Sequence, residues 1–91
     1  MIERAARIVN SQGLHARPAA LIVKLAGTFT SEITICRHGD DNGAVNAKSI
    51  MGVMTLAAEC GSSIVIRADG ADAERAAEAL TALVADGFGE Q

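Results

Sequence analysis

Aromatic side chains are almost absent from this chain. Its 91 residues include two phenylalanines, Phe29 and Phe88, and neither tryptophan nor tyrosine. Hydrophobic residues still make up 49% of the sequence, which is enough for a packed interior, so the core must be built from aliphatic side chains. Without basic clusters interleaved with aromatics, the chain has no pattern typical of a nucleic-acid-binding surface.

Cysteines and long apolar runs are also scarce. The two cysteines, Cys36 and Cys60, could pair, but no second pair and no signal peptide accompany them. We therefore expect free thiols in a reducing, cytoplasmic compartment. No apolar run approaches the roughly 20 residues needed to cross a membrane, so we expect no membrane insertion. The length predicts a single domain over residues 1–91, since domains typically hold roughly 100–200 residues.

Acidic residues are missing from one long stretch. The formal net charge of the chain is −3, yet no Asp or Glu lies between Arg4 and Ser31. The same stretch contains Arg7, Arg17 and Lys24. This part of the chain is locally basic, and we expect it to attract a phosphate group or an acidic partner.

The basic stretch contains Gly13-Leu14-His15-Ala16-Arg17-Pro18, where a helix is predicted to begin. The single proline fits a first helical turn, because its φ is fixed and it lacks an N–H. Helix-forming residues then continue to Ala26, before Gly27. His15 is thus placed where free N–H groups and the helix dipole favour an anion. Arg17 adds a cation suited to phosphate.

A neutral imidazole is nucleophilic at pH 7, so these residue types predict a phosphoryl group carried on His15. The alternative is a histidine that caps the helix or faces solvent and has no chemical role.

Hydrophobic periodicity predicts the order βαββαβα, which favours a two-layer α/β sandwich because its hairpin connections are too short for crossovers. Ser49 directly precedes an apolar run and is the predicted N-cap of the second helix. The predicted strands are 2–9, 32–37 with Ile33 and Ile35 inward, 44–46 and 64–68, and the predicted helices are 18–26, 50–56 and 73–84, with a turn at 38–43.

The first two helices carry more apolar surface than one buried stripe requires. We expect Ala19, Ile22, Val23 and Ala26 to pack on the sheet. This leaves Leu21 and Leu25 on the other side, beside Ala20 and Lys24, and the second helix has a similar surplus in Ile50, Met51 and Met54. Methionine suits a surface that contacts several partners, although a place in the core is the alternative for each of these side chains.

Two segments together resemble a known family. Gly13-Leu14-His15-Ala16-Arg17-Pro18 and Lys48-Ser49-Ile50-Met51-Gly52-Val53-Met54 are similar to the two signature segments of HPr, the histidine-containing phosphocarrier of the bacterial phosphotransferase system. The resemblance covers nearly the whole chain. It implies an open-faced α+β sandwich, with an antiparallel sheet of order 1-4-2-3 and three helices on one face.

The resemblance also implies a function, as a carrier and not an enzyme with its own turnover. His15 would be phosphorylated on Nδ1 by enzyme I, with phosphate derived from phosphoenolpyruvate, and would pass it to enzyme II A domains of sugar permeases. Arg17 would stabilise the phosphate, and Ser49 would match a regulatory phosphorylation site. An HPr kinase/phosphorylase and a transcriptional regulator are further implied partners. The residues placed in the partner-binding surface are Ala16, Ala20, Leu21, Lys24, Lys48, Ile50, Met51 and Met54.

We expect a monomer without cofactor or metal, since no His or Cys cluster has metal-ligand spacing. Two alternative functions remain. The chain could be a nitrogen-type regulatory paralogue, although residues 48–52 look closer to the sugar-system form. It could also be a small acylphosphatase-like hydrolase, but the sequence lacks a catalytic constellation and a Gly-rich phosphate loop, and His38 lies in a predicted turn.

Overall fold

The computed structural model describes residues 1–56 and 58–89. Its elements follow the predicted order. They are β1 (Ile2–Arg7), α1 (Ala16–Ala26), β2 (Glu32–Arg37), the 3₁₀ turn η1 (Asp41–Gly43), β3 (Val45–Asn46), α2 (Ile50–Thr55), β4 (Ser63–Asp69), α3 (Ala73–Ala85) and the 3₁₀ turn η2 (Gly87–Gly89).

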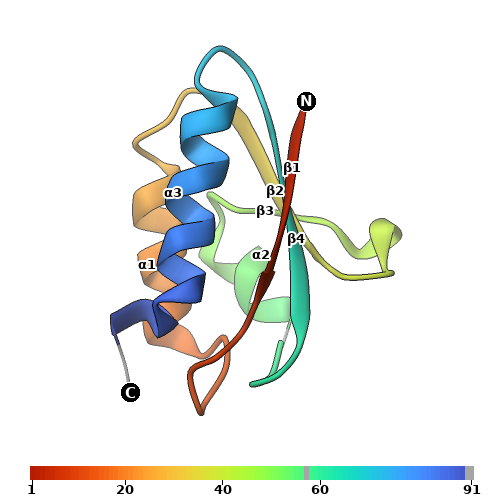
Figure 1. The fold of residues 1–91 in the computed structure, drawn as a ribbon, viewed down its shortest axis with the longest axis vertical. Helices are drawn as coiled ribbons and strands as arrows, with labels where there is room; N and C mark the ends of the chain where they lie inside the picture. Colours follow the sequence, from red (N-terminus) through yellow and green to blue (C-terminus); the bar gives the residue numbers. More distant parts are fainter. Residues whose placement is uncertain (57, 90–91) are drawn as a thin grey trace.

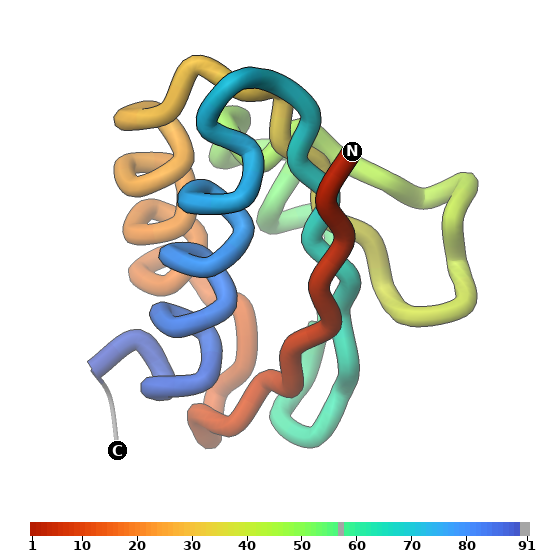
Figure 2. Tube along the Cα trace, turned by 45° about the horizontal axis from the view of Figure 1, so that its top comes forward, coloured from red at the N-terminus to blue at the C-terminus, as the bar shows by residue number. Residues whose placement is uncertain are grey.

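The four strands form one antiparallel sheet of order β1-β4-β2-β3, as the resemblance implied. The three α-helices lie on one side of the sheet, with α1 and α3 side by side, and the other face is uncovered (Figures 1 and 2). The fold is therefore the expected open-faced sandwich.

The interior is aliphatic, as the shortage of aromatic residues predicts. The strands contribute buried Ile33, Ile35, Ile64 and Ile66, each at most 1% exposed. From the helices, the largest fully buried side chains are Ile22, Val53, Leu80 and Val84. These side chains pack in one contiguous cluster between the sheet and the helices, and burying each contributes roughly 1.5–3 kcal/mol.

Phe88 closes the core at the end of the chain. It is 3% exposed and has a positive φ of 59°, a region that bulky residues seldom occupy. The glycines on either side, Gly87 and Gly89, also have positive φ. The backbone after α3 thus turns back so that this aromatic ring reaches the core.

The predicted bounds are right for β2 and close for most other elements. The first strand ends at Arg7 and not at residue 9, and Val9 is 51% exposed. The first helix begins at Ala16, so its proline is the third helical residue and not the first. The strand predicted over 44–46 is reduced to Val45 and Asn46.

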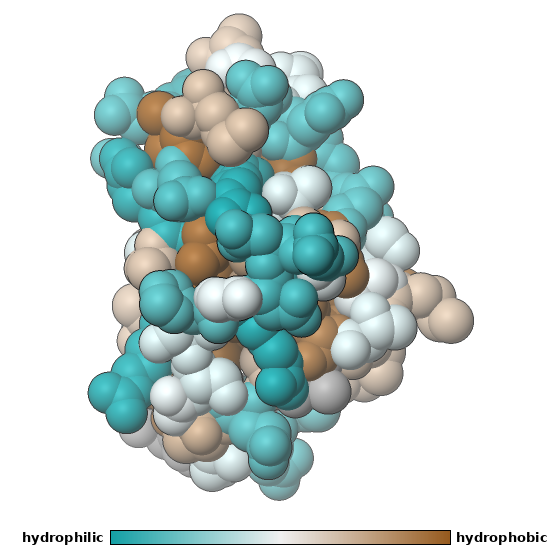
Figure 3. All heavy atoms as spheres, turned by 90° about the vertical axis from the view of Figure 1, so that its right-hand side faces the viewer, coloured by the Kyte–Doolittle hydropathy of each residue, from teal (hydrophilic) through white to brown (hydrophobic). Residues whose placement is uncertain are grey.

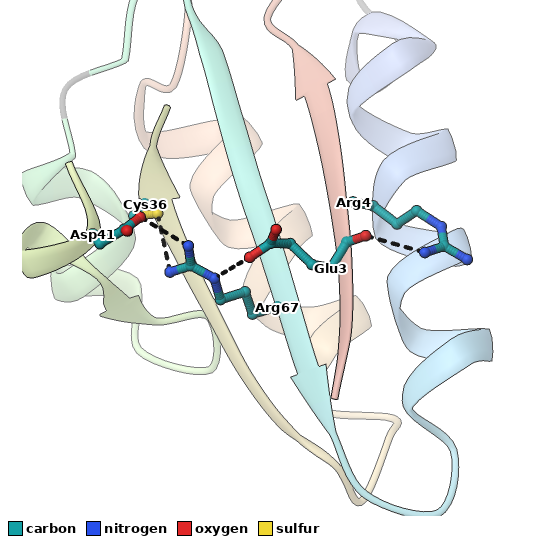
Figure 4. Close-up of polar contacts among 5 residues, drawn as sticks. All are labelled: Glu3, Arg4, Cys36, Asp41 and Arg67. Atoms are coloured by element: carbon teal, nitrogen blue, oxygen red, sulfur yellow. Dashed lines mark hydrogen bonds and ion pairs between the residues drawn. The ribbon is translucent and has the colours of Figure 1, made fainter. Parts of the chain in front are cut away.

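The uncovered face of the sheet is largely hydrophilic (Figure 3). On β4, Arg67 makes several polar contacts with neighbouring elements. Its Nε donates to Glu3 Oε2 at 2.5 Å, and its Nη2 donates to Asp41 Oδ1 at 2.8 Å. The guanidinium also approaches the Cys36 sulfur at 3.6 Å (Figure 4). Arg67 therefore connects β1, β4, β2 and η1, and its hydrogen bond and charge lower the pKa of Asp41 below its usual value.

Candidate functional site

The loop before α1 holds His15 in a defined backbone position. Gly13 has φ +66°, and a Cβ atom there would lie 2.4 Å from the Ala58 carbonyl oxygen, so only glycine fits. The next N–H, that of Leu14, donates to the same carbonyl at 2.9 Å, and the Leu14 side chain is 5% exposed in the core. The residue directly before His15 is thus anchored on both its backbone and its side chain.

His15 is the N-cap residue of α1. Its backbone is extended, with φ −87° and ψ −171°, and its carbonyl accepts the first helical hydrogen bond, from Ala19 N–H at 3.0 Å. Its side chain is half-buried. The first amides of a helix have no partner within it, and because the third residue is proline, the N–H groups of Ala16 and Arg17 are the ones left at this end. The predicted position of the histidine at a helix N-terminus is confirmed.

One basic residue and no acidic residue lie in the first turn of α1. The basic residue, Arg17, is exposed. Its guanidinium and the amides of Ala16 and Arg17, which have no partner within the helix, offer donors to an anion bound beside His15. The arrangement can hold a group with several anionic oxygens next to a ring nitrogen.

Two long-range hydrogen bonds show how α1 and α2 are placed. At the start of α2, Lys48 Nζ donates to the Phe29 carbonyl, just past the end of α1, at 2.8 Å. Past the end of α2, Ala58 accepts from Leu14, just before α1. The two helices therefore run in opposite directions, and His15 lies toward the C-terminal end of α2.

Ser49 is the N-cap of α2, as predicted, and its Oγ accepts from Gly52 N–H at 3.2 Å. Its side chain is half-buried. Because α2 has six residues, it is about 9 Å long. Ser49 is therefore at the opposite end of this helix from His15.

The apolar surplus predicted on α2 is exposed. Met51 is 73% exposed, Met54 43% and Ile50 41%. Together they form an apolar patch, here called the α2 patch. Such a cluster of large apolar side chains on a small protein is typical of a contact surface.

The surplus on α1 is placed differently. Ala16, Ala20 and Lys24 are exposed, as a docking surface requires. Leu21, however, is half-buried and packs against the core, so its side chain is only partly exposed to water. Apolar side chains of α1 and α3 meet at this point: Leu21, Leu25 and Leu83, with Lys24 and Thr28, line an open groove of about 270 Å³.

Lys48, another predicted partner-binding residue, is half-buried, and its Nζ donates a hydrogen bond to the Phe29 carbonyl within the protein.

The two cysteines are free thiols, as predicted: Cys36 is buried and Cys60 is exposed. Within residues 1–56 and 58–89, no group of three acidic, His or Cys side chains is placed to hold a metal ion. In the same residues, no helix has the length and apolar character required to span a bilayer.

Asn10 is the residue of this region that the sequence did not single out. Its side chain is 3% exposed, and its Nδ2 donates to the Gly13 carbonyl at 2.7 Å. In the sequence it is one polar residue in a loop of polar residues. Only the packed structure distinguishes it from Ser11 and Gln12, which are exposed.

Comparison with known proteins shows the family to which this chain belongs. A family profile described as "PTS HPr component phosphorylation site" matches residues 2–86. The phosphocarrier protein HPr of Cupriavidus necator is 48% identical over 90 residues, which span 99% of this chain and 98% of that protein.

Solved structures agree with these matches. A crystal structure of HPr-C-His from Thermoanaerobacter tengcongensis is 46% identical, with a TM-score of 0.90 over 100% of this chain and 99% of that one. An HPr dimer from the same organism is 47% identical, with a TM-score of 0.74 over 99% of this chain and 100% of that one. The fold and the family match are those of a phosphocarrier of the phosphotransferase system. The chain belongs to the HPr family.

Proposed function

We propose that His15 is the residue that carries the phosphoryl group, received from enzyme I and passed to enzyme II A domains of sugar permeases. The observation that supports this most directly is the position of His15 as the N-cap of α1. There the half-buried His15 directly precedes two helix amides and the exposed Arg17, in a stretch without acidic residues. Each of these features favours the phosphorylated form.

Only a few groups of this chain take part in the phosphoryl transfer itself. A ring nitrogen of His15, Nδ1 in the family to which the chain belongs, attacks phosphorus with its lone pair. The bond between phosphorus and the donor then breaks, and the donor group leaves with that electron pair. In the second transfer His15 is the leaving group. Arg17 and the amides of Ala16 and Arg17 neutralise the phosphoryl oxygens in both steps.

The partners would contact the exposed residues around His15. Ala16, Ala20 and Lys24 on α1, together with the α2 patch, make a surface that is apolar with a basic margin. Two different partners can use it in turn, because methionine side chains adapt to different shapes. A cytoplasmic location and a monomeric state belong to the same proposal, and a dimeric HPr among the similar structures makes the monomer worth testing by light scattering.

Ser49 is proposed as the regulatory site. Its hydroxyl is at a helix N-terminus, where an added phosphate is compatible with the helix dipole. An HPr kinase/phosphorylase would modify it, and a transcriptional regulator would bind the modified form. The alternative for Ser49 is the cap alone, which the structure already contains.

The nitrogen-type regulatory role is the second candidate function. It uses the same histidine chemistry, so the acceptor and not the site distinguishes the two roles. Residues 48–52 resemble the sugar-system form. Transfer from the phosphorylated protein to purified sugar-permease A domains, compared with nitrogen-type acceptors, decides between them. The hydrolase alternative is set aside, because the family match spans nearly the whole chain.

The chain offers its own control for the histidine assignment. It has two histidines, and His38 is exposed in the turn after β2. With phosphoenolpyruvate and enzyme I, we expect an acid-labile phosphate on the wild type and on His38→Ala, and none on His15→Ala. His15→Ala should remain folded, since His15 is outside the core. Labelling of a folded His15→Ala protein would contradict the assignment.

A further inference from the structure

We propose that Asn10 is a positioning residue for His15, acting through the Gly13 carbonyl. This inference depends on the proposed function of His15. Asn10 belongs to none of the motifs that suggested a function, and it lies five positions before the histidine in the sequence.

One carbonyl links the two residues. The Gly13 oxygen accepts the Asn10 side-chain Nδ2–H at 2.7 Å and the His15 backbone N–H at 3.0 Å. A carbonyl oxygen has two lone pairs, so both donors can be accommodated. In return, Gly13 N–H donates to the Asn10 carbonyl at 3.1 Å. The Asn10 amide therefore holds the oxygen of the peptide group whose N–H, that of Leu14, is held by the Ala58 carbonyl.

The orientation matters because Gly13 is permissive. Its left-handed φ of +66° is open to glycine, which also populates other regions freely. The peptide group after Gly13 is held at its N–H by the Ala58 carbonyl and at its oxygen by Asn10 Nδ2, so without the Asn10 donor only the longer His15 N–H bond opposes a rotation of that oxygen. His15 is the next residue but one, and as N-cap it is the hinge between this loop and α1. A rotation there displaces the imidazole relative to the helix amides.

Burial makes the Asn10 side chain a fixed support. It is 3% exposed, and a buried amide hydrogen bond is costly to lose. The end of the chain packs against this corner: an added Cβ on Gly87 would lie 3.9 Å from Asn10 Cβ and 3.5 Å from Val9 Cγ2. Asn10 thus connects the Gly13 carbonyl to the buried part of the protein, although His15 itself is half-exposed.

The test compares Asn10→Ala with a control variant that also loses a buried polar contact, but far from His15. Ser31 is 2% exposed and donates through Oγ to Asp72, beyond the other end of α1, so Ser31→Ala is the control. Both variants, and Asn10→Asp, which keeps the shape but replaces the donor, are studied where they are fully folded. The measurements are the rate of phosphoryl transfer from enzyme I and hydrogen exchange of the His15 amide.

We expect Asn10→Ala and Asn10→Asp to slow transfer by about tenfold, since misplacement of a reacting group by about 1 Å can cost up to a hundredfold. Exchange of the His15 amide should accelerate by a similar factor in both. Ser31→Ala should change neither by more than about twofold. Equal behaviour of Asn10→Ala and Ser31→Ala in both measurements would overturn the proposal, as would an unchanged Asn10→Asp. If the wild type takes up no phosphate, the proposed function fails, and the exchange rates alone then decide whether Asn10 holds His15.

Discussion

At the scale of single residues, the site depends on a few backbone groups as much as on side chains. The sequence predicted that His15 lies at a helix N-terminus, although the helix begins two residues earlier than predicted, because a proline and a run of helix formers are local signals. It could not predict that Asn10 is buried, since that burial comes from the packing of residues 10–14 against the loop at Ala58 and against Gly87. It also could not predict the pairing of Arg67 with Glu3 and Asp41, which are far away in sequence.

Arg17→Ala should slow phosphoryl transfer without abolishing it. The substitution removes a charge-assisted contact, while the amides at the start of α1 remain. We expect a rate about tenfold lower, which corresponds to about 1.4 kcal/mol, with phosphohistidine still formed at the end point. Arg75→Ala, which removes the same charge from an exposed position on α3, is the control. If the two variants transfer at the same rate, Arg17 contributes only general surface charge.

At the scale of elements, local patterns predicted β2 and the start of α2 correctly. The alternation of apolar residues predicted β2, and the position of Ser49 directly before an apolar run predicted the N-cap of α2. The exposure of individual helix residues was harder to predict. On α1, Leu21 was assigned to the surface by helical spacing, but α3 lies beside α1 (Figure 2), and Leu21 is partly buried against the core. The side chains of the α2 patch are more exposed than Leu21.

This difference separates two variants that the sequence alone treats alike. Met51→Glu should weaken binding to enzyme I and change the free energy of unfolding by no more than about 0.5 kcal/mol, because Met51 is 73% exposed. Leu21→Glu should lower stability by about 1–3 kcal/mol, since it places a carboxylate against the core. Calorimetric binding and urea unfolding measure the two effects.

The control for Met51→Glu is Ala5→Glu. Ala5 is exposed on β1 and alternates with the half-buried residues of that strand, so the added charge lies on the sheet face opposite the helices. If Ala5→Glu weakens binding as much as Met51→Glu, the α2 patch is not the contact surface and the effect is one of net charge.

At the scale of the whole molecule, the carboxylate of Asp72 fastens the start of α3 to the segment between α1 and β2. It accepts from the Ser31 hydroxyl and from the N–H groups of Thr30 and Ser31, at 2.9 and 3.0 Å respectively. These hydrogen bonds, with that of the Ser31 hydroxyl contributing most, lower the pKa of Asp72 from 3.8 to about 2. The contact is distant from His15 and concerns stability alone.

The direction of the pH effect follows from this shift. A carboxyl group whose pKa is lower in the folded state stabilises the fold when it is ionised. The contribution of Asp72 is thus fully present above about pH 4 and is lost as the pH falls toward 2. Urea unfolding between pH 6 and 2 should show a smaller loss for Asp72→Asn than for the wild type. The lowered pKa of Asp41 acts in the same direction, so Asp41→Asn is measured alongside. A pH dependence identical to that of the wild type in Asp72→Asn would exclude Asp72 as a contributor.

The opposite directions of α1 and α2 determine what a phosphate on Ser49 can do. Ser49 begins α2, whose C-terminal end lies toward His15, and the α2 patch lies along the helix between them. A phosphoserine adds about −1.5 to −2 charges and would act on the approaching partner, not on the imidazole itself. We therefore expect it to weaken binding of enzyme I, and hence to raise the KM for this protein, while the rate at saturation changes little.

The comparison needs the wild type, the enzymatically phosphorylated protein, Ser49→Asp and Ser49→Ala. Transfer to His15 should be slowest at low concentration for the phosphorylated form and less affected for Ser49→Asp, which carries a smaller charge. Ser49→Ala removes the cap and should cost about 0.5–2 kcal/mol of stability without slowing transfer. Added salt should reduce the difference between the charged and uncharged forms, because the groups are exposed to solvent. Equal transfer rates for all four proteins would leave Ser49 with the role of a helix cap only.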